Sequence, residues 1–97
     1  MKPLIFRPAA AADVEAAFGW YEEKRTGLGH EFLEVVASME AAVSERPESF
    51  PVVHRDARRA LLPRFPYALY YRIYDDRILV VACIHARRHP RRWMSRA

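Results

Sequence analysis

Residues 65–85 read FPYALYYRIYDDRILVVACIH and have the strongest β-strand character in the chain. From Tyr67 to Tyr74, β-branched and aromatic residues dominate, which is typical of a strand. Strand alternation puts Tyr67, Leu69, Tyr71 and Ile73 on one face and Ala68, Tyr70, Arg72 and Tyr74 on the other. Asp75-Asp76 then predicts a tight turn, after which residues 77–85 return as the next strand.

The returning strand is apolar without alternation. A strand of this kind is expected at the centre of a sheet, covered on both faces. We expect helices to cover one face. The C-terminal segment, with Trp93 and Met94, is the candidate cover for the other face.

Two helices are predicted upstream of these strands. Pro8 suits the first position of a helix. The apolar face of this helix is expected to consist of Val14, Ala17, Phe18 and Tyr21, with Asp13 and the glutamates mostly off it. After a break at residues 27–29, a second helix, which Arg46-Pro47 ends, has the apolar positions Phe32, Val35, Val36, Met39 and Val43.

Shorter elements complete the predicted fold. Residues 4–6 and 58–62 are expected to be short strands, and residues 48–51 a loop, because two prolines four residues apart do not fit a paired strand. The sequence therefore predicts a single α+β domain over residues 1–97. Its order is an N-terminal strand, a helical hairpin, an antiparallel three-strand meander and a short basic C-terminal segment.

Length and charge limit the function. A chain of 97 residues has room for one hydrophobic core. Residues 1–53 contain five Lys/Arg and nine Asp/Glu, a net charge of −4, whereas residues 54–97 contain eleven Arg and three acidic residues, a net charge of +8. Arginine binds phosphate and carboxylate through two parallel hydrogen bonds. The second half is therefore expected to meet a polyanionic or carboxylate-bearing partner.

The expected compartment is the cytoplasm. Cys83 is the only cysteine, so it forms no intrachain disulfide, and its apolar neighbours predict that it is buried. The N-terminus has only three consecutive apolar residues, which are too few for a signal-peptide core. No stretch approaches the roughly 20 apolar residues that span a bilayer.

Arginine residues are the main candidates for function. Residues 85–96 hold five arginines, two histidines and Trp93, a combination that can neutralise phosphate and stack on a base, although a merely solvated basic end is the alternative. Only one of Arg58 and Arg59 can join an exposed basic surface, because neighbours on a strand point to opposite faces. Arg72 either binds a partner or lies over tyrosine rings at the sheet surface.

Candidates for chemistry are few. His85 and His89 have an i, i+4 spacing used for zinc, but a strand end and Pro90 argue against a helix there, so neither a metal nor a cofactor is expected. His85 is a candidate general acid or base, or a strand-end histidine hydrogen-bonded to the main chain. Cys83 is expected to be a core residue, because an apolar setting raises the pKa of a thiol.

The chain resembles the RelE/ParE toxin family of bacterial toxin–antitoxin systems. The residues that carry the resemblance are Trp20-Tyr21, Gly29 with Phe32, residues 47–51, Phe65-Pro66-Tyr67 with the following strand, and His85-x-Arg87-Arg88-x-Pro90-x-x-Trp93. The resemblance implies a toxin that a cognate antitoxin neutralises. One branch of the family, similar to RelE, cleaves messenger RNA in the ribosomal A site, and the other, similar to ParE, inhibits DNA gyrase.

The match to the RNA-cleaving branch is incomplete. Its C-terminal arginine corresponds to Arg88, and a basic strand residue corresponds to Arg59. Where that branch has an arginine after the tyrosine of the third strand, this chain has Ala68, and Trp93 stands in place of a terminal tyrosine. Losing a cation that stabilises the transition state typically costs a few kcal/mol, so the gyrase-directed branch is favoured.

Three hypotheses follow from the sequence. The first is a ParE-like gyrase inhibitor without a catalytic centre, whose antitoxin covers an apolar groove beside the helical hairpin. The second is a ribosome-dependent ribonuclease that uses His85 or a tyrosine with Arg59, Arg87 and Arg88, and the third is a degenerate module that only binds antitoxin. A homodimer and a toxin–antitoxin hetero-oligomer both remain open. The predicted target-binding residues are Arg58, Arg59, Arg72, Arg87, Arg88, Arg91, Arg92 and Trp93.

Overall fold

A computed structural model describes residues 1–87 and 90–96. The predictions made for Arg88 and His89 concern residues outside these ranges. The elements in chain order are β1 (Leu4–Phe6), α1 (Pro8–Lys24), α2 (Leu28–Glu45), a 3₁₀ turn (Pro47–Ser49), β2 (Val52–His54), β3 (Ala57–Leu61), β4 (Tyr67–Ile73), β5 (Ile78–His85) and α3 (Pro90–Met94). The α+β class is confirmed. Within the described residues, no helix is long and apolar enough to cross a membrane.

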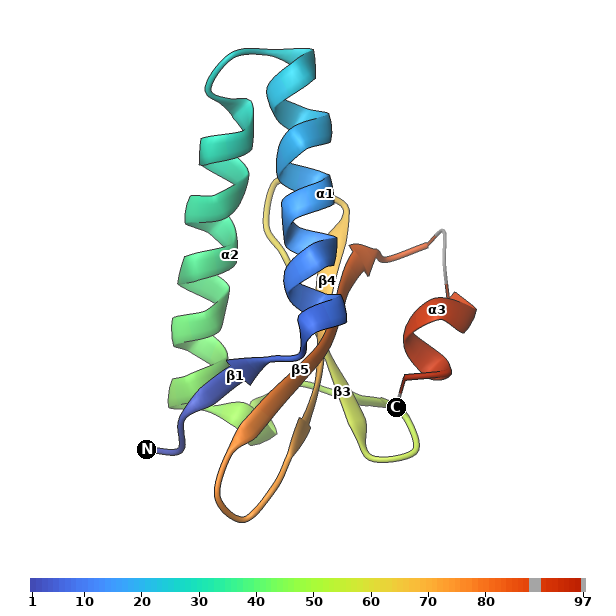
Figure 1. Cartoon of the computed structure of the whole chain (residues 1–97). Coiled ribbons are helices and arrows are strands. Elements are labelled where there is room, and N and C mark those ends of the chain that lie inside the picture. Colours follow the sequence, from blue (N-terminus) through green and yellow to red (C-terminus); the bar gives the residue numbers. More distant parts are fainter. Residues whose placement is uncertain (88–89, 97) are drawn as a thin grey trace.

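The five strands form one sheet in the order β1-β5-β4-β3-β2. β1 pairs with β5 in parallel, and the other neighbours are antiparallel. β5 is therefore an interior strand, as its apolar sequence predicts. Helices α1 and α2 stand side by side on one side of the sheet, and α3 lies on the other side (Figure 1).

The two faces of β4 divide as the alternation predicts. Leu69 and Tyr71 belong to the core cluster beneath α1 and α2, which also contains Phe32. Ala68 and Tyr70 belong to a second cluster on the opposite face, together with Trp93. The expectation that the C-terminal segment covers this second face is confirmed, because Trp93 is 4% exposed there.

Some features were missed or wrong in the sequence prediction. Strand β2 was not predicted, since a three-residue strand after Pro51 has too few positions to show alternation. Asp13 was expected mostly off the buried face of α1, but it is 8% exposed, while Val14 and Phe18 are only partly buried. The buried stripe of α1 consists of Ala10, Asp13, Ala17 and Tyr21.

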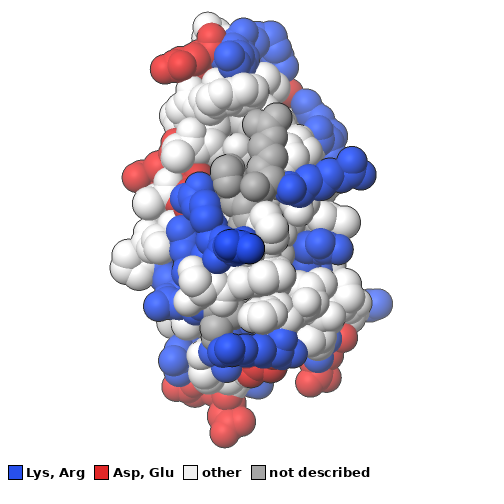
Figure 2. Space-filling view, turned by 90° about the vertical axis from the view of Figure 1, so that its right-hand side faces the viewer, with Lys and Arg blue, Asp and Glu red and all other residues white. Residues whose placement is uncertain are grey.

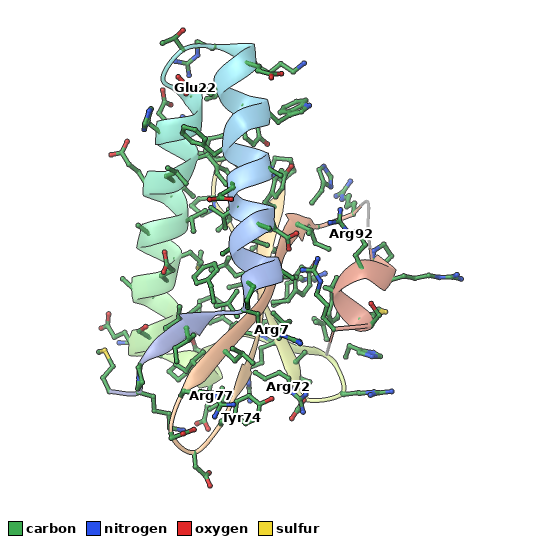
Figure 3. All side chains as sticks on the ribbon, in the orientation of Figure 1. Arg7, Glu22, Arg72, Tyr74, Arg77 and Arg92 are labelled. Carbon is green, nitrogen blue, oxygen red and sulfur yellow. The ribbon has the colours of Figure 1, made fainter. Side chains whose placement is uncertain are left out.

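The turn between α1 and α2 depends on two glycines and one carboxylate. Gly27 has φ +92°, in the left-handed region that side chains disfavour. Glu22, near the end of α1, accepts hydrogen bonds from the backbone N–H groups of Gly27 and Gly29, each at 2.9 Å. These bonds hold the pKa of Glu22 below its ordinary value. Figure 3 shows Glu22 at this end of the hairpin.

We expect Gly29→Ala to destabilise the protein. A Cβ atom at this position would lie 2.7 Å from the carbonyl oxygen of Phe18 and 2.8 Å from its ring, so α1 and α2 would have to move apart. Overpacking of this kind costs about 1–3 kcal/mol of unfolding free energy. Urea denaturation followed by circular dichroism measures the change.

Gly19→Ala is the matched control for this prediction. Gly19 also lies in a helix, but a Cβ there meets no atom of the described residues within 4 Å. Alanine in a helix interior is favoured over glycine by about 0.5–1 kcal/mol, so this variant is expected to be more stable than wild type. Equal stability of the two variants would show that the helices do not require glycine at position 29.

Candidate functional site

Three exposed arginines of the C-terminal half lie on or next to α3, whereas the exposed Arg64 pairs with Glu31 of α2. Arg87 follows β5, and Arg91 and Arg92 lie on α3, and all three are exposed. Figure 2 shows this side, where blue basic side chains are spread among white, uncharged ones. We call Arg87, Arg91 and Arg92 the basic patch. Such a surface can pair with carboxylates or phosphates of a partner.

The structure separates Arg58 from Arg59. Arg58 lies opposite Tyr71 in the β3–β4 register and faces the helices, where its Nη1 donates to the carbonyl oxygens of Phe50 at 2.7 Å and Glu48 at 3.1 Å. Arg59 lies opposite Tyr70, on the side of α3. Its buried Nε finds no hydrogen-bond partner among the described residues. Of the two, only Arg59 lies on the side of the basic patch.

Arg72 lies away from the basic patch. Its guanidinium forms a two-point ion pair with Asp56, with Nε 2.8 Å from Oδ1 and Nη2 3.0 Å from Oδ2. It also lies 5.6 Å from the ring centre of Tyr74. Figure 3 shows Arg72, Tyr74 and Arg77 at the hairpin end of β4 and β5, well separated from Arg92. The geometry therefore agrees with the structural interpretation of Arg72, as an arginine over a tyrosine ring.

Trp93 is part of the second core cluster and not an open surface. Its ring stacks on Tyr70 with centroids 4.3 Å apart and an interplanar angle of 14°. His54 meets the same ring edge-on at 5.6 Å. Burial raises the pKa of Tyr70, with a smaller opposite effect from the Arg59 guanidinium that hydrogen-bonds to it. The stack fixes α3 on the sheet.

His85 ends β5 beside the basic patch. Its Nδ1 accepts a hydrogen bond from the backbone N–H of Arg87 at 3.2 Å, which agrees with the main-chain alternative stated above. The imidazole also packs edge-on against Tyr67, with centroids 5.8 Å apart. Among the described residues, no three side chains that favour metals come together.

A cleft of about 320 Å³ lies between α1, the end of β5 and α3. Its walls include Trp20, Tyr67 and His85, and Asp13 and Arg92 also line it. Sequence reasoning assigned no functional role to Trp20 or Asp13. One sequence feature could have identified Trp20: it lies next to the apolar positions of α1 but is not one of them. In the structure, Trp20 is 51% exposed.

A second groove lies on the outer side of the helical hairpin, with a volume of about 290 Å³. Its apolar residues are Phe6, Ala11, Val14, Leu33 and Val36, and Glu15 and Glu40 also line it. Partial burial raises the pKa of Glu40. An apolar segment that also carries positive charge would complement this lining.

Cys83 is confirmed as a core residue. It is 1% exposed, and burial raises the pKa of its thiol to about 12. At neutral pH the thiolate is therefore too scarce, and the sulfur too hidden, for a nucleophile.

Comparisons with known proteins agree with this geometry. The sequence matches the family model for the ParE toxin of type II toxin–antitoxin system, parDE, over residues 4–90. No curated protein matches closely enough to count as a relative. A solved structure described as the chromosomal ParDE TA system from P. aeruginosa shares the fold, with TM-score 0.67, 20% identity, and coverage of 88% of this chain and 96% of that chain. Because the family match spans nearly the whole sequence, this chain belongs to the ParE toxin family of type II toxin–antitoxin systems.

Proposed function

We propose that this toxin inhibits DNA gyrase, and thereby replication, by binding through the basic patch. The observation that carries the proposal is the exposure of Arg87, Arg91 and Arg92 on one side of the molecule, beside a well-packed α3. Charges at the rim of an interface speed association with a partner of opposite charge. Gyrase and its bound DNA both offer carboxylates or phosphates to such a patch.

The proposed antitoxin site is the groove on the outer side of the hairpin. Its lining combines Val14, Leu33 and Val36 with two glutamates. An antitoxin segment with apolar anchors and lysine or arginine beside them would fit this chemistry. Residues of β1, α1 and α2 line the groove. Arg91 and Arg92 lie on α3, which Figure 1 shows on the other side of the sheet.

A ribosome-dependent ribonuclease is the second candidate, and Arg59 beside Tyr70 is the observation that favours it. Two features count against it. Trp93 stacks on Tyr70, which is 1% exposed, so this phenol is covered and the proton would have to be moved by His85 or another tyrosine. Ala68, which replaces the arginine of the cleaving branch, is fully buried. Electrostatic stabilisation of a phosphorane requires hydrogen-bond donors aimed at its oxygens, and alanine at position 68 supplies none.

Labelling of macromolecular synthesis in bacterial cells tests this choice. Induction of the toxin without antitoxin is expected to stop thymidine incorporation first and to induce the DNA-damage response. A ribonuclease would stop leucine incorporation first. Normal growth despite correctly folded protein at high level would contradict both activities and would support a module that only binds antitoxin.

A further inference from the structure

The carboxylate of Asp13 lies at the centre of a buried network that reaches the C-terminal segment. Its side chain, on α1, is 5% exposed. Oδ2 accepts hydrogen bonds from Arg96 Nη1 at 2.6 Å and from the backbone N–H of Cys83 at 3.1 Å. Oδ1 lies 3.4 Å from Arg96 Nη2 and 3.5 Å from Arg92 Nη2. One carboxylate therefore joins α1, β5 and the segment that contains α3.

Arg96 extends this network in two further directions. Its Nη1 also donates to the carbonyl oxygen of Val81 at 3.0 Å. Its own carbonyl oxygen accepts a hydrogen bond from Arg7 Nη1 at 2.8 Å. Figure 3 shows Arg7 at the junction of β1 and α1. Residue 96 is thus fastened to three parts of the fold that are distant in sequence.

Helix α3 depends on such tertiary contacts for its position. It has five residues, and a helix this short does not persist by itself in water. The Trp93–Tyr70 stack holds its underside, and the Asp13–Arg96 pair holds its end. Removing either partner of a buried ion pair leaves the other as an uncompensated buried charge. Loss of Asp13 or of Arg96 is therefore expected to release the C-terminal segment in the same way.

We propose that Asp13 is a positioning residue, whose buried carboxylate anchors the C-terminal segment and thereby holds Arg91 and Arg92 in place for the target. The anchoring is a property of the fold alone. Its link to gyrase inhibition rests on the proposed function. Asp13 acts through Arg96 and Arg92 and makes no contact with the target itself.

Hydrogen exchange measured by mass spectrometry tests the anchoring. In Asp13→Asn and in Arg96→Gln, the backbone amides of residues 92–96 are expected to exchange at least about tenfold faster, with those of β4 and β5 unchanged in Arg96→Gln. Arg96→Gln leaves the sequence of α1 and of the sheet unchanged, so it reports even if Asp13→Asn folds poorly. Arg96→Lys keeps the charge and is expected to restore most of the protection. Glu23→Gln, an exposed change on α1, is the control and is expected to exchange like wild type.

The double variant separates an anchor from two unrelated contacts. If Asp13 and Arg96 act as a pair, the double variant exchanges about as fast as the faster single variant. Two results would overturn the anchoring. One is unchanged exchange in Arg96→Gln, and the other is a rate increase in the double variant equal to the product of the increases in the two single variants.

Gyrase inhibition tests the positioning role separately. Where wild type inhibits purified gyrase, Arg96→Gln is expected to need at least about tenfold more protein for half-inhibition, a factor that corresponds to about 1.4 kcal/mol. If Arg96→Gln exchanges faster but inhibits gyrase as well as wild type, the positioning role of Asp13 is overturned, whereas its anchoring of the C-terminal segment stands. If wild type does not inhibit gyrase, the proposed function fails, the positioning role fails with it, and the exchange results still decide the anchoring.

Discussion

Phe32→Ala is expected to lower the free energy of unfolding by about 3–5 kcal/mol, the usual cost of truncating a buried aromatic residue. Phe32 on α2 is fully buried, and its ring centroid lies 5.4 Å from Tyr21, 5.3 Å from Phe65 and 5.4 Å from Tyr67. The cavity would therefore open where both helices meet the sheet. In a domain of this size, each kcal/mol shifts the Tm by roughly 4–8 °C. Calorimetry should record a fall of at least about 12 °C.

Leu33→Ala is the matched control, because Leu33 is the next residue on the same helix and is 36% exposed. Its removal is expected to cost less than about 1 kcal/mol, as for most surface substitutions. If both variants melted within a few degrees of wild type, the aromatic cluster would not be the centre of the core.

Reversing two charges of the basic patch is expected to have the largest effect on function. In Arg87→Glu/Arg91→Glu, both changed side chains are exposed, and neither contacts Asp13, so the anchor of α3 stays intact. Attraction to carboxylates or phosphates becomes repulsion. The concentration that half-inhibits supercoiling by purified gyrase is expected to rise at least about tenfold, while the Tm stays close to that of wild type.

Arg25→Glu/Arg46→Glu controls for net charge. It changes the same number of charges, but Arg25 and Arg46 follow the ends of α1 and α2, far along the chain from the basic patch. Inhibition by this variant is expected to stay within a few-fold of wild type. Equal loss in both variants would mean that overall charge, and not the basic patch, governs inhibition.

The sequence predicted the elements whose side chains repeat regularly. The alternation from Tyr67 to Ile73 identified both faces of β4, and the unbroken apolar run identified β5 as interior, because burial on two faces leaves no polar positions. Trp93 was likewise identified as the cover of the second face. Periodicity could not give the parallel pairing of β1 with β5, since three residues specify no partner.

Parts of the candidate site depended on contacts that no local pattern encodes. Asp13 looked like a surface acid near a run of alanines, and its burial depends on partners far along the chain, among them Cys83, 70 positions away, and Arg96, 83 positions away. Likewise, the choice between Arg58 and Arg59 required the register of β3 against β4. Composition did indicate a basic C-terminal half, but it could not show that Arg58, Arg72 and Arg96 are held by internal partners.

Supercoiling of relaxed plasmid by purified gyrase, titrated with the wild-type toxin, tests the central claim most directly. We predict that supercoiled product falls as toxin is added, and that higher salt weakens the effect, because the basic patch acts through charge. Unchanged supercoiling at toxin concentrations well above that of gyrase, together with A-site cleavage of mRNA in a translation reaction, would contradict the account.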